Sequence, residues 1–294
     1  MEHYSKSEIL GKGSFGVVYL AVDKQGKKAV FKEIILAGLS DNDVENRRKE
    51  VKLLSTLNHP HVIKYYGHKV DNGILTIYME YAVNGTLKHY IENKKELIEE
   101  NEIIKLFSQL LLAIEYVHNL KIIHRDICNR NVLLSFNNRI KLADFGISRH
   151  IETFSSTNNL CGHPGNLAPE LCHGNKHSMS SDMWALGCLL YELCTLNAPF
   201  KAPTIAGLLI SVLESPTPEI SPKYNSLLQT LVNSLLSRDP ASRPTAKSLL
   251  AYPLLAPYIH TLPVLYHQTS NELTESDKQL LSYFCPNIVQ ELNL

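Results

Sequence analysis

The sequence has no excess of charge of either sign, because 29 lysines and arginines balance 29 aspartates and glutamates. Without a net field the chain has no general attraction to nucleic acid or to an anionic membrane, so no nucleic-acid partner is expected. It also lacks any run of about 18 apolar residues, the length that a membrane span requires. The N-terminal MEHYSKSEIL has no apolar signal-peptide core. These absences predict a protein that has no membrane partner and works inside the cell.

Closely spaced cysteine pairs are missing as well. The six cysteines form no CxxC pair and show no regular spacing. Zinc modules and disulfide frameworks both depend on such patterns, so neither is predicted. Reduced thiols are the expected state.

The first quarter of the chain has a β-type pattern. At 294 residues the chain exceeds the common single-domain size, so one two-lobed domain or two domains would fit. Short apolar runs from Tyr4 to Met79, separated by Gly, Asp and Asn, predict a small antiparallel sheet. A helix is predicted within it at about 43–57, where Val51 and Leu54 fall on one face and Asp43 favours the N-terminus.

The rest of the chain has helical patterns. Apolar residues recur at helical spacing over 103–117, and the segment 182–196 is apolar nearly all round, which predicts a buried helix. Further helices are expected at 226–236 and 245–251, and 274–284 is weakly amphipathic. The pattern therefore predicts a β-rich N-lobe, a helical C-lobe and a short tail.

A glycine-rich loop lies between the first two predicted strands. Gly11, Gly13 and Gly16 form GKGSFGVV, whose backbone can close over phosphates without β-carbon clashes. A dinucleotide-binding loop would lead into a helix, whereas this one leads into a strand. Lys32 follows in the next strand and is expected to reach the phosphates, with Glu50 on the following helix as its ion-pair partner.

Three further motifs follow in order. They are HRDICNRN with Asp126 and Asn131, then Asp144 in DFG, and then Ala168 to Glu170. Asn131 and Asp144 offer the hard oxygen ligands that Mg²⁺ prefers, and Asp126 offers a carboxylate that can accept a proton.

With these motifs in this order, the chain resembles eukaryotic protein kinases over residues 4–260. The resemblance implies an α+β, two-lobed protein kinase fold. Its parts are a small antiparallel β N-lobe with one helix (about 4–79), a hinge (about 80–84) and a larger, mostly helical C-lobe (about 85–260). Residues 261–294 would form a C-terminal tail, containing a short helix or a site for a protein partner.

The resemblance also implies ATP and Mg²⁺ as cofactors, with a role for each matching residue. The nucleotide site would comprise Gly11, Lys12, Gly13, Ser14, Gly16, Val18, Lys32, Met79, Glu80 and Ala82. The catalytic residues would be Asp126, Lys32, Glu50 and Arg130, and the metal ligands Asn131 and Asp144. Asp182 would hold the catalytic loop, and Arg243 would pair with Glu170.

The segments SDMWALGCLLYELCTLNAPF and HPHVIKYYG most resemble NIMA-related (Nek) kinases. Arg130 is similar to a tyrosine-kinase residue, but GHPGNLAPE follows the Ser/Thr pattern. The resemblance thus implies ATP-dependent phosphorylation of Ser/Thr hydroxyls in protein substrates. It also implies a cytoplasmic location with cytoskeletal association.

Three positions depart from the family pattern. Cys128 replaces a lysine that neutralises the γ-phosphate, and Arg130 is hypothesised to supply the missing cation. His163 replaces a threonine near the acceptor, and Asn159 replaces a phosphorylatable threonine. These departures leave an alternative open, namely an ATP-binding pseudokinase or scaffold with weak or no transfer.

Overall fold

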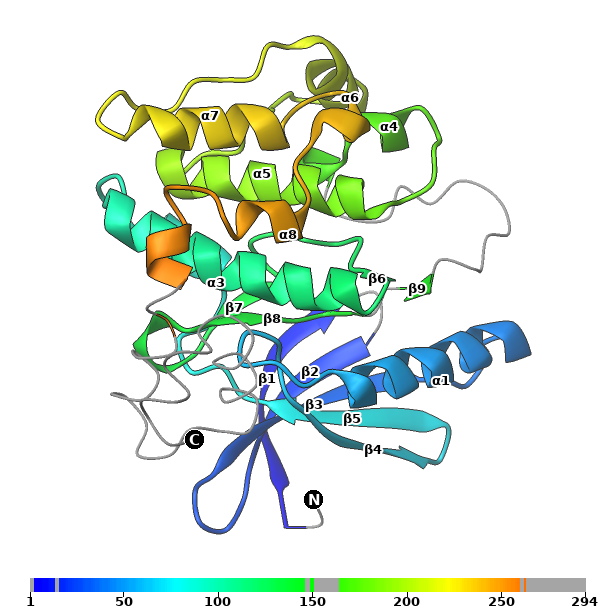
Figure 1. Ribbon diagram of the computed structural model, residues 1–294. Helices are drawn as coiled ribbons and strands as arrows, with labels where there is room; N and C mark the ends of the chain where they lie inside the picture. Colours follow the sequence, from blue (N-terminus) through cyan, green and yellow to red (C-terminus); the bar gives the residue numbers. More distant parts are fainter. Residues whose placement is uncertain (1–2, 14–15, 146–148, 151–163, 260–261, 263–294) are drawn as a thin grey trace.

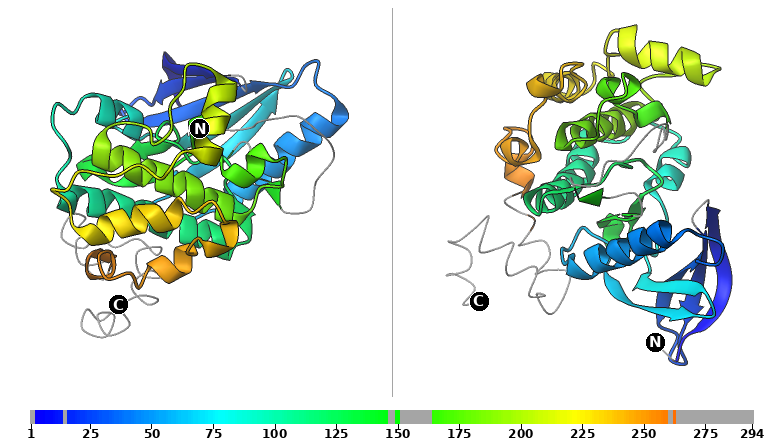
Figure 2. Two further views of the ribbon diagram at one scale, coloured as in Figure 1. Left: turned by 90° about the horizontal axis from the view of Figure 1, so that it is seen from above. Right: turned by 90° about the vertical axis from the view of Figure 1, so that its right-hand side faces the viewer.

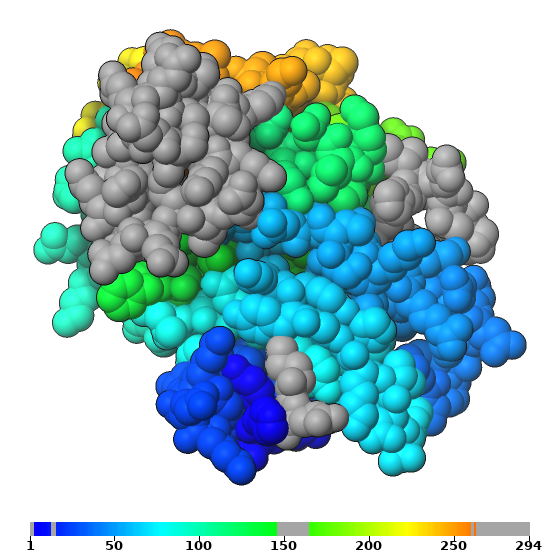
Figure 3. All heavy atoms as spheres, turned by 60° about the horizontal axis from the view of Figure 1, so that its bottom comes forward, coloured from blue at the N-terminus to red at the C-terminus, as the bar shows by residue number. Residues whose placement is uncertain are grey.

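Two lobes of different composition make up the molecule, with the sheet below and the helices above in Figure 1. The computed structural model describes residues 3–13, 16–145, 149–150, 164–259 and 262. The N-lobe sheet has five strands in the order β1-β2-β3-β5-β4, and all its pairs are antiparallel. Its strands are β1 (Ser5–Gly13), β2 (Gly16–Val22), β3 (Lys28–Ile35), β4 (Tyr65–Asp71) and β5 (Ile74–Glu80). Figure 3 shows this lobe from below, with its blue and cyan atoms in front of the green and orange C-lobe atoms.

The strand register sets which side chains face the C-lobe. Lys32 is paired with Val18 on β2 and with Ile77 on β5, so the three side chains share one face of the sheet. Ile77 belongs to the main hydrophobic core. Side chains on the opposite face, including Ala29 and Phe31, form a small separate cluster. Because successive side chains of a strand alternate between its two faces, Lys32 points toward the space between the lobes.

Helix α1 (Asp41–Thr56) is the helix predicted within the N-lobe. It begins two residues earlier than expected, because Ser40 is the N-cap and its Oγ accepts a hydrogen bond from the Asp43 amide at 3.2 Å. Asp43 lies in the first turn, where its negative charge favours the helix dipole. Val51 and Leu54 are buried against the core, as their spacing predicts.

The C-lobe is mostly helical and packs around α5. Its helices are α2 (Leu87–Glu92), α3 (Glu100–Asn119), α4 (Pro169–Cys172), α5 (Met179–Thr195), α6 (Ile205–Glu214), α7 (Ser226–Leu235) and α8 (Ala246–Leu249). Figure 2 shows α5 enclosed by neighbouring helices. A β-carbon on Gly187 would lie 2.7 Å from the Leu235 side chain, so this glycine allows α5 and α7 to approach closely. Helices α2, α4 and α6 were not predicted from the sequence.

Short strands and turns complete the C-lobe. They are β6 (Ile122–Ile123), β7 (Val132–Leu134), β8 (Ile140–Leu142) and β9 (Arg149–His150), with 3-10 turns η1 (Phe136–Asn138), η2 (Pro164–Asn166) and η3 (Pro240–Ser242). The architecture confirms the predicted α+β, two-lobed class. Within the described residues, none of the helices has the length and apolar character needed to cross a membrane.

Candidate active site

A loop between β6 and β7 carries the HRD motif, and Asp182 of α5 forms hydrogen bonds with its backbone. Asp182 accepts hydrogen bonds from the His124 amide at 2.8 Å and the Arg125 amide at 2.9 Å. His118 Nε2 lies 2.9 Å from the same carboxylate. These contacts lower the pKa of Asp182 although burial opposes them, so the carboxylate stays ionised. The predicted role of Asp182 is confirmed.

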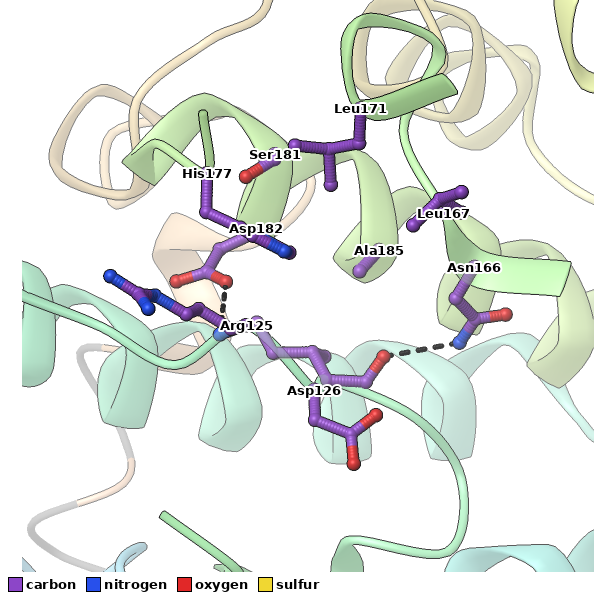
Figure 4. Close-up of a pocket in the computed structure, with 10 residues that line it drawn as sticks. Arg125, Asp126, Asn166, Leu167, Leu171, His177, Ser181, Asp182 and Ala185 are labelled. Atoms are coloured by element: carbon purple, nitrogen blue, oxygen red, sulfur yellow. Dashed lines mark hydrogen bonds between the residues drawn. The ribbon is translucent and has the colours of Figure 1, made fainter. Parts of the chain in front are cut away.

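A small cavity separates this loop from α5 (Figure 4). Its volume of about 20 Å³ admits about one water molecule. Asn166 spans one end, where its Nδ2 donates to the Ile127 carbonyl at 3.1 Å. Burial, followed by the charge of Arg125, lowers the pKa of His177 on the opposite wall. The Asp126 carboxylate points to the far side of the loop from Asp182 (Figure 4), so this cavity supports the loop from behind.

Asp126 and Asn131 lie on the open side of the loop. Asn131 Nδ2 donates to Asp126 Oδ2 at 2.8 Å and to the Asp126 carbonyl at 2.8 Å. The Ala143 amide donates to the Asn131 carbonyl at 2.8 Å, which places the next residue, Asp144, beside Asn131. Asp144 has a φ of 61° and Arg125 a φ of 72°, a left-handed backbone that is costly for residues other than glycine. The structure thus brings the predicted base and both predicted metal ligands together.

Lys32 and Glu50 have different partners from those predicted. Lys32 Nζ lies 2.8 Å from Asp144 Oδ1, whereas Glu50 Oε2 lies 3.1 Å from Arg47 Nη1 on its own helix. Among the described residues, no ion pair joins Lys32 to Glu50, so the structure corrects this expectation. The physical reason is competition, because a buried carboxylate takes the cation within reach and Arg47 lies one turn away.

The glycine loop is described on both sides of Ser14, which lies outside the described residues. A β-carbon on Gly16, whose φ is 142°, would lie 1.9 Å from the Glu33 carbonyl oxygen, so only glycine fits there. A β-carbon on Gly11 would meet nothing within 4 Å. Lys12, at the end of β1, is exposed. Gly16 is thus required by the sheet itself, while Gly11 leaves open space that a phosphate needs.

The predicted hinge follows β5. Met79 and Val18 are half-buried, and Ala82 is buried. The Glu80 amide donates to the Lys64 carbonyl at 2.8 Å, and its side chain pairs with Lys141 Nζ at 2.9 Å. This ion pair joins the end of β5 to β8 of the C-lobe. The adenine contacts proposed for Glu80 and Ala82 stay predictions.

The residues around Cys128 differ in their access to solvent. Cys128 is 3% exposed, and burial followed by the charge of Asp126 raises the pKa of its thiol. It therefore remains a neutral thiol and supplies no cation. Arg130 is exposed, and the described residues offer it no ion-pair partner. His163 and Asn159 lie outside the described residues.

Two supporting contacts were missed from the sequence. Asn129 Nδ2 donates to Glu192 Oε2 at 2.9 Å, which anchors the catalytic loop to α5, and Asn166 clamps Ile127 as described above. Burial raises the pKa of Glu192 to about 7. A single acid in the otherwise apolar end of α5 was a usable signal, since buried acids need partners. Nothing comparable pointed to Asn166.

A buried ion pair stabilises the part of the C-lobe around α4. Arg243 Nη1 and Nη2 donate to the two Glu170 carboxylate oxygens at 2.8 and 2.7 Å. The guanidinium also lies 5.1 Å from the Trp184 ring centroid. This fork geometry confirms the predicted pairing of Arg243 with Glu170.

The oxygen atoms of Asn131 and Asp144 suit a metal ion that binds together with a nucleotide. In the described part of the chain, no group of three or more His, Cys, Asp or Glu residues could hold a metal ion. Asn131 and Asp144 supply one amide and one carboxylate oxygen, and the Asp144 side chain is 42% exposed. Mg²⁺ typically takes one or two carboxylates and completes its shell with substrate phosphates and water. The residues therefore fit a magnesium ion bound together with a nucleotide.

Comparisons with known proteins agree with this geometry. The protein kinase domain model matches residues 4–255. Mouse serine/threonine-protein kinase Nek1 is 37% identical over 253 residues, which cover 85% of this chain and 21% of Nek1. Human serine/threonine-protein kinase Nek11 is 34% identical over 285 residues, covering 94% of this chain and 43% of Nek11.

A shorter relative is matched over most of its length. Serine/threonine-protein kinase nekl-2 of Caenorhabditis elegans is 32% identical over 271 residues, covering 88% of this chain and 76% of nekl-2. By contrast, the chain spans about a fifth of Nek1 and less than half of Nek11. The chain belongs to the protein kinase family, and its relatives within that family are Nek serine/threonine kinases.

Proposed function

We propose that this protein transfers the γ-phosphoryl group of ATP to Ser or Thr hydroxyls of protein substrates. The observation that carries the proposal is the joint placement of the base and the metal ligands. Asn131 Nδ2 donates to Asp126 Oδ2, and Asp144 lies beside Asn131. One carboxylate can then accept a hydroxyl proton while the other faces the nucleotide. The names of the relatives support Ser/Thr as the acceptor.

The chain's own residues have distinct tasks in this reaction. Asn131 fixes one Asp126 oxygen, which leaves Oδ1 to accept the substrate hydroxyl and aim it. Lys32 lies on the sheet face toward the cleft and can hold phosphate oxygens once it leaves Asp144. ATP with Mg²⁺ supplies the phosphoryl group and neutralises its charge. Asp182 keeps the loop in its left-handed conformation throughout.

Arg130 is proposed to supply the cation that Cys128 cannot. It is permanently charged, exposed, and two residues along the same loop. Losing one preorganised electrostatic group typically costs about 10²- to 10³-fold in rate, so we expect Arg130→Ala to reduce transfer by this factor. Arg48→Ala, which removes an exposed arginine of α1, is the matched control. Unchanged transfer in Arg130→Ala, with Asp126→Ala inactive, would rule out this role.

The test of the function is magnesium-dependent incorporation of radiolabelled phosphate by the purified protein, with Asp144→Ala as control. Transfer by the unmodified chain and none by Asp144→Ala is the expected result. ATP binding with no magnesium-dependent transfer would instead support the pseudokinase alternative. That alternative finds no support in the relatives, which are named as kinases.

A further inference from the structure

A second hollow lies on the C-lobe, on the N-terminal half of α3 and away from the catalytic loop. Its volume is about 640 Å³, within the range of roughly 300 to 1,000 Å³ that is typical of ligand sites. Apolar side chains from two segments line it: Ile104 and Leu106 of α3, and Leu254, Pro257 and Tyr258 after α8. Its polar residues are Asn101, Glu102, Lys105 and Asn138. We call this hollow the α3 groove.

One rim charge of the α3 groove is uncompensated. Glu102 lies 3.4 Å from Lys94 Nζ, so its charge is partly balanced. Lys105 is half-buried, and no ion pair to it is found among the described residues. An unpaired cation beside an apolar wall favours a partner that combines carboxylates with apolar side chains.

The chain itself contains such a segment close by. The residues that line the α3 groove lead directly to Leu262, which is 3% exposed. Residues 263–294 follow and contain four acidic residues and one lysine. Within them, ELTESDKQLLSYF (272–284) places carboxylates first and Leu280, Leu281 and Phe284 at helical spacing later.

Length and similarity both favour binding within one chain. Residues 263–271 can span at most about 30 Å, enough to lead the segment back to the groove. A tether this short gives an effective concentration of order millimolar, so a weak contact is sufficient. Mouse Nek11 matches 98% of this chain, which includes most of residues 256–294. The matched region of that relative therefore extends through this part of the chain.

We propose that residues 272–284 dock into the α3 groove of their own chain, with Leu280, Leu281 and Phe284 on the apolar wall and acidic residues near Lys105. The proposal does not depend on phosphoryl transfer. It assigns this face of the C-lobe an occupant of defined chemistry, an acidic amphipathic segment.

Hydroxyl-radical footprinting of the full chain tests this docking through the side chains of Leu254 and Tyr258. If about nine-tenths of the molecules have the segment docked, the double variant Leu280→Asp with Leu281→Asp should raise the modification of Leu254 and Tyr258 by up to about tenfold. The matched control, Gln279→Asp with Ser282→Asp, adds the same two charges at polar positions. In this variant the modification of the groove side chains should stay low. The unfolding midpoint of each variant is compared with that of the unmodified chain, to exclude general destabilisation as the cause of a higher modification.

A charge exchange gives a second, independent measurement. Lys105→Glu should raise modification of Leu254, and adding Glu275→Lys should lower it again. Protection that increases with protein concentration would overturn docking within one chain and indicate a second copy instead. Equal modification of Leu254 and Tyr258 in the unmodified chain and the Leu280/Leu281 variant would overturn the proposal altogether.

Discussion

The C-lobe and N-lobe halves of the active site differ in how completely their polar groups are paired for catalysis. On the C-lobe side, Asp182 holds the loop backbone and Asn131 orients Asp126. On the N-lobe side, Lys32 and Glu50 each have a partner but not each other. The acceptor-side machinery is therefore preassembled, whereas the phosphate-side pair requires an exchange of ion-pair partners.

The exchange has a physical route. Asp144 is both the partner of Lys32 and a predicted metal ligand. If the Asp144 carboxylate held a magnesium ion, Lys32 would lose this partner, and Glu50 is the carboxylate that the family resemblance assigns to it. Glu50 is 7% exposed, and a buried carboxylate is costly without a charged partner. The proposed function therefore predicts that nucleotide binding is coupled to pairing of Lys32 with Glu50.

The largest expected effect concerns the C-lobe, which carries the preassembled side. Glu170→Ala leaves Arg243 buried without its carboxylate, and we expect the free energy of unfolding to fall by about 3 to 5 kcal/mol. Urea unfolding of the purified protein measures this. Glu219→Ala removes an exposed glutamate with no ion pair among the described residues and should change stability by less than about 0.5 kcal/mol. Equal losses in both variants would show that the buried pair does not stabilise the C-lobe.

The sequence predicted the buried polar contacts of the C-lobe better than the ion-pair partners of Lys32 and Glu50. Asp182 and the pair of Glu170 with Arg243 were identified, because buried charges inside a core have few alternative partners. The strands of the N-lobe and most of the long helices also followed from periodicity. In contrast, the partner of Glu50 depends on which cation α1 brings within reach, a matter of a few ångströms that spacing does not encode. Helix α6 has a usable start signal in its N-cap Thr204, but Gly207 in the first turn weakens the helical pattern.

A smaller effect concerns the loop between α1 and β4, which packs against the C-lobe. His59 is buried and stacked on Tyr116, and its Nδ1 accepts a hydrogen bond from the His61 amide at 3.2 Å. Burial, followed by the charge of Lys141, lowers the pKa of His59 to about 3. Below about pH 6.5, His59 therefore binds a proton in the unfolded chain but stays neutral in the folded chain.

From this difference we expect stability to fall as the pH drops from 7.5 to 5. The contribution of His59 to that fall is about 2 kcal/mol, because each unit of pKa difference is worth about 1.4 kcal/mol. In His59→Gln the drop between the two pH values should be smaller by this amount, measured by urea unfolding. His89→Gln, at an exposed histidine, should keep the full drop. If His59→Gln also kept it, the buried histidine would not cause the pH dependence.

The smallest expected effect sharpens the comparison between the lobes. Arg47→Gln removes the cation that holds Glu50, and a buried carboxylate without a partner favours pairing with another cation, for which we expect Lys32. We expect kcat/KM for ATP to rise about fivefold, that is by about 1 kcal/mol in transition-state free energy. Arg48→Gln changes an exposed arginine on the same helix and should leave kcat/KM unchanged. An Arg47→Gln variant that is slower than the unmodified chain would mean that Arg47 positions Glu50 for catalysis, and the pairing seen here would then belong to the working state.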